Sequence, residues 1–418
     1  MVRLKADPTY VGSGFSRTVG GDWMKIAVPK ETAAGERRVA LVPESAKKLI
    51  QSGYQIAVES TAGDPAGFPD TAYRDVGVTI AHDRAALLGS ADLVLKVTAP
   101  AVAGLLDEVA AMKSGAIYLG SLMPLRHLDA VRALAARRIT AFATDAIPRT
   151  TRAQSMDTLS SMASISGYKG VLLGAVELNR YFPMLTTAAG MVFPAKVFVI
   201  GAGVAGLQAI ATARRLGANV VATDVRPEVK EQIESVGAKY VGIELEESAA
   251  AGGGYAKELS DEDRQHQSQL LALECAQSDV VVTTALIGGV FAPRLISSDV
   301  VKTMKPGSII VDLAADGGGN CELSKPGETV QAGGVTILAP VNLAATMPYH
   351  ASLLFSRNLT SFVQAFTKDK AFQLDFEDDI QKGAVITHAG EVTHARTREA
   401  LVKALRLEPG ARSLEPGD

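Results

Sequence analysis

The chain has 418 residues, enough for two or three domains, and is 47% hydrophobic and 21% charged. This balance excludes an intrinsically disordered chain, and the net charge of −3 argues against nucleic acid or anionic lipid as a partner. The two cysteines, Cys275 and Cys321, exclude a disulfide scaffold and a cysteine-based zinc site.

Residues 1–23 lack the apolar run of a secretory signal, and we interpret them as an N-terminal extension. After them, strands alternate with helices. Strands are predicted at Lys25–Val28, Tyr54–Glu59, Ala91–Val97 and Ala116–Leu119, and helices at Ser45–Ser52 and Leu128–Arg137. This alternation predicts an α/β fold in which helices cover both faces of a parallel sheet.

The middle of the chain repeats the alternation more strongly. Strands are predicted at Lys196–Ile200, Asn219–Thr223, Val280–Thr284, Ser308–Val311 and Val335–Ala339, with a helix at Gly206–Leu216. The segment Ala249–Gln269 begins with glycines and turns polar, which indicates a mobile loop leading into a polar helix. Near the end we predict an amphipathic helix at Leu353–Phe366 and short strands at Phe372–Phe376 and Ala384–His388. No stretch offers the roughly 20 apolar residues of a membrane-spanning helix.

The strongest local signal is the glycine-rich turn Gly201-Ala202-Gly203-Val204-Ala205-Gly206, between a predicted strand and a predicted helix. Its first glycine permits the tight turn, its second lets backbone N–H groups approach a pyrophosphate, and its third allows close helix–strand packing. Asp224 ends the next strand, where its carboxylate can accept hydrogen bonds from a ribose and repel a 2′-phosphate. Arg226 weakens that discrimination slightly. The motif predicts a site for NAD(H) rather than NADP(H).

A second polar segment, residues 148–162, joins the two halves of the chain. Arg149, Gln154, Asp157 and Ser160 can form a polar cradle for an amide-bearing ring. The alternative is a helix N-terminus capped by serine or aspartate, which the residues alone favour.

Several segments together resemble one known family. They are Met24–Pro43, RAQSMD at Arg152–Asp157, the glycine-rich turn and its helix at Gly201–Ala218, GGYAKE at Gly253–Glu258, TTALIGG at Thr283–Gly289, and Val311–Ser324. They are similar to the soluble NAD(H)-binding alpha (domain I) subunits of the proton-translocating NAD(P) transhydrogenases. The wider family includes alanine dehydrogenase, and the resemblance extends to about His394.

This resemblance implies two Rossmann-like lobes with NAD(H) in the cleft between them. The expected first lobe is discontinuous, 24–157 and 349–418, and the second lobe is 158–348. Hydride transfer is expected between NADH on this chain and NADP⁺ on a partner subunit, coupled to proton translocation by membrane-embedded subunits. The resemblance also implies that the chain is a homodimer. We expect it to be cytoplasmic and peripheral at the inner membrane, where it docks onto separate membrane subunits.

The resemblance also implies site residues. The nicotinamide end is expected to contact Arg149, Arg152, Gln154, Asp157 and Ser160, with Arg149, Gln154 and Asp157 as the catalytic residues. The residues expected around the pyrophosphate and adenosine are Gly201, Ala202, Gly203, Val204, Ala205, Gly206, Asp224, Val225 and Arg226. By the same resemblance, Gly254 and Tyr255 are expected to belong to a mobile loop that closes over the nucleotide, and Leu286 is a further expected contact.

Alanine dehydrogenase is an alternative. Arg38 and Lys96 match its substrate-binding pair, and Asp316 stands at the position of its catalytic aspartate. Where its catalytic histidine follows a strand, this chain has Met123, with His127 four positions later, and methionine cannot accept a proton. A catalytically silent NAD(H)-binding module is a third possibility. The six histidines are scattered, so no metal site is expected.

Overall fold

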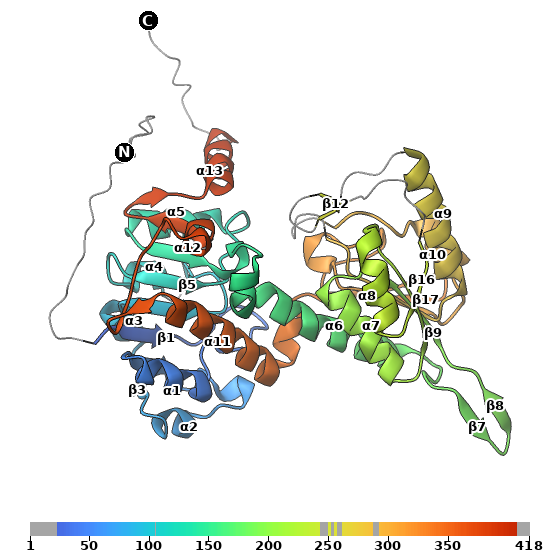
Figure 1. The fold of residues 1–418 in the computed structure, drawn as a ribbon, viewed down its shortest axis with the longest axis horizontal. Coiled ribbons are helices and arrows are strands. Elements are labelled where there is room, and N and C mark those ends of the chain that lie inside the picture. The colour runs from blue at the N-terminus through green and yellow to red at the C-terminus, as the bar shows by residue number, and fades with distance from the viewer. Residues whose placement is uncertain are drawn as a thin grey trace, which may run out of the picture.

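The computed structural model describes residues 23–104, 106–242, 250–251, 255–256, 261–286 and 292–407. They form two α/β lobes, each built on its own sheet and seen at the left and right of Figure 1. We call the lobe with the eight-stranded sheet lobe one and the lobe with the seven-stranded sheet lobe two.

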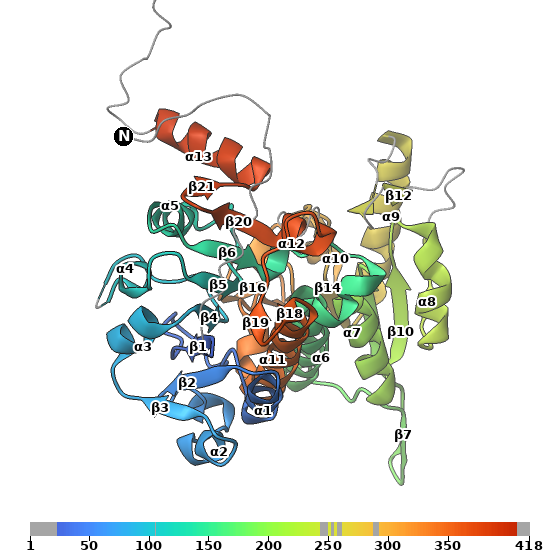
Figure 2. The same ribbon diagram turned by 60° about the vertical axis from the view of Figure 1, so that its left-hand side comes forward.

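The sheet of lobe one has the strand order β3-β2-β1-β4-β5-β6-β20-β21. The six strands from β3 to β6 are parallel, whereas β20 and β21 join the edge antiparallel. The strands are β1 (Lys25–Val28), β2 (Gln55–Glu59), β3 (Thr79–Ala81), β4 (Leu93–Lys96), β5 (Ile117–Gly120), β6 (Thr140–Ala143), β20 (Val385–His388) and β21 (Glu391–Val392). The chain's C-terminal region therefore returns to complete this sheet, as Figure 2 shows.

The sheet of lobe two has the strand order β11-β10-β9-β14-β15-β17-β16, and only its edge strand β16 runs antiparallel. Its strands are β9 (Lys196–Ile200), β10 (Asn219–Thr223), β11 (Lys239–Tyr240), β14 (Val280–Thr283), β15 (Ile309–Asp312), β16 (Thr329–Ala332) and β17 (Val335–Leu338). In both sheets the strand order reverses beside the first strand, at β1/β4 and at β9/β14. Such switch points, at the carboxyl ends of the strands, are where open α/β sheets bind ligands.

Helices cover both faces of each sheet, as the sequence predicts. Those of lobe one are α1 (Pro43–Gln51), α2 (Asp70–Arg74), α3 (Arg84–Ser90), α4 (Glu108–Ala111), α5 (Leu128–Ala136), α12 (Asp379–Ala384) and α13 (Ala395–Leu407). Those of lobe two are α7 (Val204–Arg215), α8 (Lys230–Ser235), α9 (Asp261–Gln277) and α10 (Ser298–Thr303). Buried side chains alternate between the faces: Val280 and Val282 pack with α7, whereas Val281 packs with α9 and α10.

Two long helices, α6 (Thr158–Glu177) and α11 (Pro348–Ala365), lie between the lobes (Figure 1). Phe355 and Leu359 of α11 are buried in the core of lobe one, whereas Val171 of α6 is buried in the core of lobe two. Ile165 and Ala351 join the two helices in a small apolar cluster of their own. Each helix is therefore anchored in one lobe and packs against the helix of the other.

The sequence-based elements are largely confirmed, with one error and several omissions. The strand predicted at Phe372–Phe376 is wrong, because only Ala371–Phe372 (β19) pairs, in a hairpin with β18 (Thr367–Lys368). The polar stretch of Ala249–Gln269 does form a helix, α9, while residues 249, 252–254 and 257–260 lie outside the described residues. Sequence patterns missed several elements. Among them are β3, β6, β11, β16, β21, the full length of α6, the helices α2, α3, α4, α8, α10, α12 and α13, and the hairpin of β7 (Leu185–Thr187) and β8 (Gly190–Val192). None of the helices within the described ranges is long and apolar enough to cross a bilayer.

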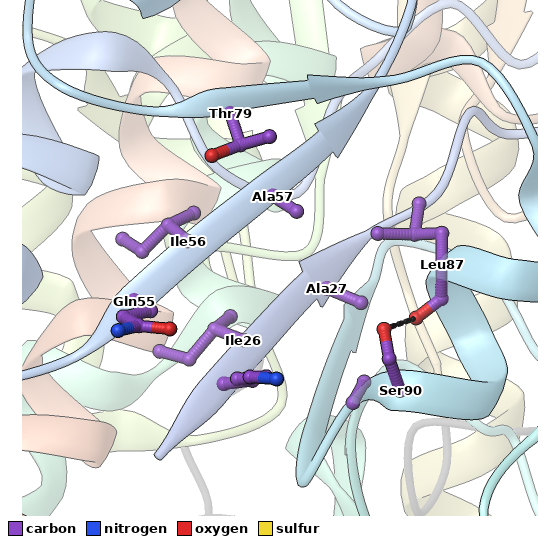
Figure 3. Close-up of a pocket in the computed structure, with 10 residues that line it drawn as sticks. Ile26, Ala27, Gln55, Ile56, Ala57, Thr79, Leu87 and Ser90 are labelled. Carbon is purple, nitrogen blue, oxygen red and sulfur yellow. Dashed lines mark hydrogen bonds between the residues drawn. The ribbon is translucent and has the colours of Figure 1, made fainter. Parts of the chain in front are cut away.

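A small cavity of about 190 Å³ lies in lobe one, between α3 and strands β1 to β3 (Figure 3). Ala27, Ala57 and Leu87 line it, and Ser90 donates a hydrogen bond to the carbonyl of Leu87. Lys25 and Gln55 also line it, and they begin β1 and β2, so the cavity reaches the amino ends of the strands. A dinucleotide is expected at the opposite, carboxyl edge.

A buried cluster of charged side chains fills the switch point of lobe one. The ammonium of Lys96, the last residue of β4, lies 2.9 Å from a carboxylate oxygen of Glu108 and 3.4 Å from one of Glu31. All three side chains are at most 2% exposed. Burial alone would lower the pKa of Lys96, but the carboxylates of Glu31 and Glu108 raise it, so the lysine stays protonated.

We predict that Glu108→Gln lowers the free energy of unfolding by about 3–5 kcal/mol, because it leaves the ammonium of Lys96 buried and poorly compensated. Urea unfolding followed by circular dichroism measures the loss. As a control, Asp299→Asn removes the exposed pair with Lys302 and should leave the unfolding midpoint nearly unchanged. If Glu108→Gln and Asp299→Asn lowered the free energy of unfolding by the same small amount, that result would contradict a buried charged cluster around Lys96.

Candidate functional site

The glycine-rich turn lies at the switch point of lobe two. It follows the last residue of β9, and Gly201 adopts a φ of +95°, which favours glycine. A Cβ atom on Gly206 would stand 1.8 Å from the carbonyl oxygen of Gly201, so only glycine fits there. Thr284, which follows β14, donates a hydrogen bond of 3.0 Å to the same carbonyl. The turn is thereby fixed between the ends of β9 and β14.

The N-terminus of α7 is open to a ligand. Gly203 is the N-cap residue, no side chain caps the helix, and both Gly203 and Val204 are exposed. A Cβ atom on Gly203 would meet nothing within 4 Å. The first backbone N–H groups of a helix lack intrahelical partners and carry the positive end of the helix dipole. This arrangement fits the pyrophosphate of a dinucleotide.

Asp224 connects this turn to the next strand. One oxygen of its carboxylate accepts a hydrogen bond of 2.7 Å from the backbone N–H of Ala202, and Arg226 donates three more, each of 2.9 Å. The hydrogen bond to Asp224 raises the pKa of Arg226. A ribose that approaches Asp224 must therefore share the carboxylate with the guanidinium of Arg226, a constraint that the sequence pattern did not indicate. Val225 lies half-buried between them.

The segment predicted to form a polar cradle is a 3₁₀ helix, Thr151–Met156, that runs into α6. Asp157 caps α6: its carboxylate accepts hydrogen bonds of 2.8 Å from the Ser160 backbone and 2.6 Å from the Ser160 hydroxyl. The capping alternative is therefore confirmed. Arg149 and Gln154 are exposed, and neither side chain forms a hydrogen bond or ion pair with any other described residue. Both side chains are therefore available to a ligand.

Arg152, a further predicted ligand of the nicotinamide end, has other partners in this structure. Its guanidinium lies 2.6 Å from a carboxylate oxygen of Asp378 and also contacts Asp379. Both aspartates belong to the start of α12 in lobe one.

Helix α6 holds this loop at a fixed distance from the glycine-rich turn. A Cβ atom on Gly167 would stand 2.1 Å from the carbonyl oxygen of Ala205, so the backbones of α6 and α7 touch there. Farther along α6, Gly170 lies against the side chain of Leu313 and Gly174 against the side chain of Val280. At 1.5 Å per residue, the ten residues from Asp157 to Gly167 separate the loop from the turn by about 15 Å.

The remaining predicted contacts are partly described. Tyr255 begins β13 (Tyr255–Ala256), which pairs with β12 (Ala250–Ala251), while Gly254 lies outside the described residues. Leu286 follows β14 and is 40% exposed. It lies two positions after Thr284, and therefore near the glycine-rich turn.

Sequence reasoning missed two buried residues that hold together the carboxyl ends of the strands in lobe two. Asp312, the last residue of β15, accepts hydrogen bonds from the hydroxyls of Thr283 and Ser324, at 3.0 and 2.6 Å. The side chain of Asn320 exchanges two hydrogen bonds with the backbone of Ala285. The role of Asp312 could have been predicted, because it is a carboxylate at the end of a buried strand. No pattern in the neighbouring sequence indicated the role of Asn320.

The residues that match alanine dehydrogenase are already engaged with other groups. Arg38 pairs with Glu36 at 2.6 Å and donates a hydrogen bond of 3.0 Å to Asn342. Burial alone would raise the pKa of Glu36, but its contacts with Arg38 hold the pKa below the usual value. The carboxylate of Asp316 accepts a hydrogen bond of 3.3 Å from the backbone of Asn342. Lys96 is buried in the cluster described above.

Met123 follows β5 with a φ of +45°, and its N–H donates a hydrogen bond of 3.0 Å to Asp145. The exposed His127 precedes α5. Among the residues that the structure covers, no three histidine, cysteine, aspartate or glutamate side chains gather as a metal site would require.

Two Rossmann-like lobes, one of them with an open glycine-rich turn at its switch point, define the class of dinucleotide-binding α/β proteins. Comparison with protein families is more specific. Residues 27–166 match the alanine dehydrogenase/PNT N-terminal domain, and residues 170–395 match the alanine dehydrogenase/PNT C-terminal domain. The chain belongs to the alanine dehydrogenase/PNT family.

The relatives of this chain within the family include both transhydrogenase subunits and alanine dehydrogenases. The chain is 47% identical to an NAD(P) transhydrogenase alpha subunit of Rhodospirillum rubrum, over 89% of this chain and 98% of the relative. It is 31% identical to an alanine dehydrogenase of Halomonas elongata, over 90% of this chain and 96% of the relative. Among solved structures, transhydrogenase from Sinorhizobium meliloti matches with a TM-score of 0.80 and 42% identity, over 88% of this chain and 99% of that one.

We predict that Gly203→Ala leaves the fold stable but weakens NADH binding about tenfold or more, because the methyl group blocks approach of the pyrophosphate to the uncapped N–H groups. Fluorescence titration of NADH measures the affinity. In contrast, Gly206→Ala should lower the thermal unfolding midpoint as well, because its Cβ collides with the carbonyl of Gly201. Unchanged NADH affinity in Gly203→Ala would contradict a pyrophosphate site at this turn.

Proposed function

We propose that this chain is the NAD(H)-binding component of a proton-translocating NAD(P)⁺ transhydrogenase. In this function, hydride passes directly between NADH on this chain and NADP⁺ on a partner subunit. Membrane-embedded partner subunits couple the transfer to proton movement and hold the chain at the inner membrane on its cytoplasmic side. The names of the relatives at 47% and 42% identity support this proposal over alanine dehydrogenase.

The observation that carries the proposal is the connection of the open turn, through α6, to a loop that presents Arg149 and Gln154. We assign the pyrophosphate to the N–H groups at Gly203 and Val204, and the adenosine side to Asp224, Val225 and Arg226. We assign the nicotinamide end to Arg149 and Gln154, with Asp157 and Ser160 shaping the loop through the cap of α6. When bound, the nicotinamide supplies the hydride.

This chain's own residues then have to bind, orient and exclude water. Direct hydride transfer between two nicotinamides needs no proton acceptor, so positioning is the main contribution of the protein. An arginine and an amide on a loop fixed to a long helix can orient a carboxamide-bearing ring. Tyr255 and Gly254 are proposed to close over the nucleotide and exclude water.

Alanine dehydrogenase is the weaker candidate for a specific structural reason. Oxidation of an amino acid needs a cation for the substrate carboxylate and a base near the reacting carbon. Arg38 and Lys96 already pair with glutamates, and Met123 stands where a histidine is required. Asp316 alone does not supply both functions.

We predict that the purified chain binds NADH more tightly than NADPH and does not oxidise NADH when pyruvate and ammonium are added. Fluorescence titration and absorbance at the nicotinamide band measure the two results. Addition of the NADP(H)-binding partner subunit should start hydride transfer. Rapid oxidation with pyruvate and ammonium would identify an alanine dehydrogenase, and binding without transfer to the partner would identify a silent module.

We propose that the chain functions as a homodimer. The amphipathic helix α11 is packed inside the chain, with Phe355, Leu359 and Phe362 buried. The hairpin β7–β8 projects from lobe two in Figure 1 and Figure 2, and the apolar side chains in and beside it are exposed: Met184 is 57%, Met191 56% and Phe193 77% exposed. An isolated two-stranded hairpin is marginal in water, so a second copy of the chain is the proposed partner of this surface.

Phe193→Glu is predicted to convert the dimer to a monomer with little change in NADH affinity, because a carboxylate cannot be buried unpaired in an apolar interface. Light scattering coupled to size-exclusion chromatography measures the mass. The matched control is Leu374→Glu, at a residue of lobe one that is 42% exposed, and it should remain dimeric. A monomeric wild-type chain would refute the homodimer, and a dimeric Phe193→Glu variant would place the interface elsewhere.

A further inference from the structure

The loop that carries Arg149 and Gln154 is held from lobe one at more than one point. The side-chain amide of Asn358, on α11, donates a hydrogen bond of 2.8 Å to the carbonyl of Ser155. A Cβ atom on Gly383, in α12, would stand 3.0 Å from the ring of Pro148, so this helix packs directly on the start of the loop. Both contacts come from regions of the chain more than 200 residues away.

The third point is an ion pair. Arg152 projects from the middle of the loop, and its guanidinium contacts the carboxylates of both Asp378 and Asp379. Asp378 is only 13% exposed, and the same carboxylate caps α12 by accepting hydrogen bonds from the N–H groups of Ile380 and Gln381. The ion pair lowers the pKa of Asp378 and raises that of Arg152.

Helix α12, which carries the two aspartates of this ion pair, is held rigidly. Ile380 and Ala384 of α12 are fully buried in the core of lobe one, so the helix cannot shift without disturbing that core. An arginine that meets two carboxylates fixed to such a helix is restricted in position and orientation. The loop between Pro148 and Asp157 is thereby fixed at its start, its middle and its end, while Arg149 and Gln154 remain available.

We propose that Arg152 is a positioning residue for hydride transfer, which acts through Asp378 and Asp379 to hold the loop that orients the nicotinamide, and does not itself contact the nucleotide. This inference rests on the proposed function. It separates Arg152 from Arg149, although both lie in one short polar segment. It also assigns a role in the reaction to α12, which belongs to the C-terminal segment that returns to lobe one.

The test is a double-mutant cycle measured on the chain assembled with its NADP(H)-binding partner. The variants are Arg152→Gln, Asp378→Asn with Asp379→Asn, and all three substitutions together. Asparagine caps a helix as well as aspartate does, so α12 keeps its cap while the charge is lost. Hydride transfer from NADPH to an NAD⁺ analogue of shifted absorbance gives the rate, and NADH fluorescence gives the affinity.

We expect Arg152→Gln and the double aspartate variant each to slow hydride transfer about fivefold, because an ion pair of this kind contributes modestly. The triple variant should be no slower than either, since both remove the same contact. NADH affinity should change less than the rate, and thermal unfolding should be nearly unchanged, which separates positioning from general destabilisation. The matched control is Glu377→Gln, which removes an exposed neighbouring charge that pairs with no other described residue and should transfer hydride at the wild-type rate.

Three results would overturn this inference alone: a triple variant slower by a further factor of about five, a loss in Arg152→Gln that the aspartate variant does not share, or no loss in either. The first two would mean that Arg152 contacts the nucleotide directly. A wild-type chain that binds no NADH, or that transfers no hydride with its partner, would overturn the proposed function, and the inference with it.

Discussion

The backbone contact between α6 and α7 is the constraint on which the rest of the site depends. Gly167 lies against the carbonyl of Ala205, so that no side chain separates the two helices. Any larger residue at position 167 would push α6 away from the turn that opens α7. Because the loop with Arg149 and Gln154 runs into the N-terminus of α6, this one contact sets the distance and orientation between the two halves of the proposed nucleotide site.

The six parallel strands of each lobe follow the same order, but the two lobes use their switch points in opposite ways. In lobe two the switch point holds an uncapped helix N-terminus and a glycine with open space beside it, which leaves donors for an anion. In lobe one the corresponding position is filled by Lys96 with Glu31 and Glu108, and every charge there already has a partner. The fold alone therefore does not locate the ligand; the residues at each switch point do.

The proposed reaction fits a site in which most residues position the backbone and few take part in the chemistry. Asp157 and Asn358 hold the backbone of the loop in place, and Asp312 and Asn320 hold the backbone at the strand ends of lobe two. Hydride transfer between two nicotinamides demands such positioning, because the rate depends steeply on the placement of donor and acceptor. In contrast, oxidation of an amino acid needs a base and a cation for the substrate carboxylate. Met123 cannot serve as the base, and Arg38 and Lys96 already pair with glutamates.

The sequence by itself determined the features that depend on neighbours along the chain. Buried runs predicted most strands, and the spacing of glycines after β9 predicted the turn, since a strand, a tight turn and a helix start are encoded within a few residues. Only the tertiary structure decided the contacts made across the chain. Phe372 and Phe376 are apolar in a strand-like pattern, yet both pack their rings against Phe142, and only Phe372 belongs to a strand. Arg152 contacts Asp378 because the C-terminal region of the chain returns to lobe one, and Lys96 contacts Glu31 because β4 pairs with β1. No local periodicity in the sequence records which distant segments will meet.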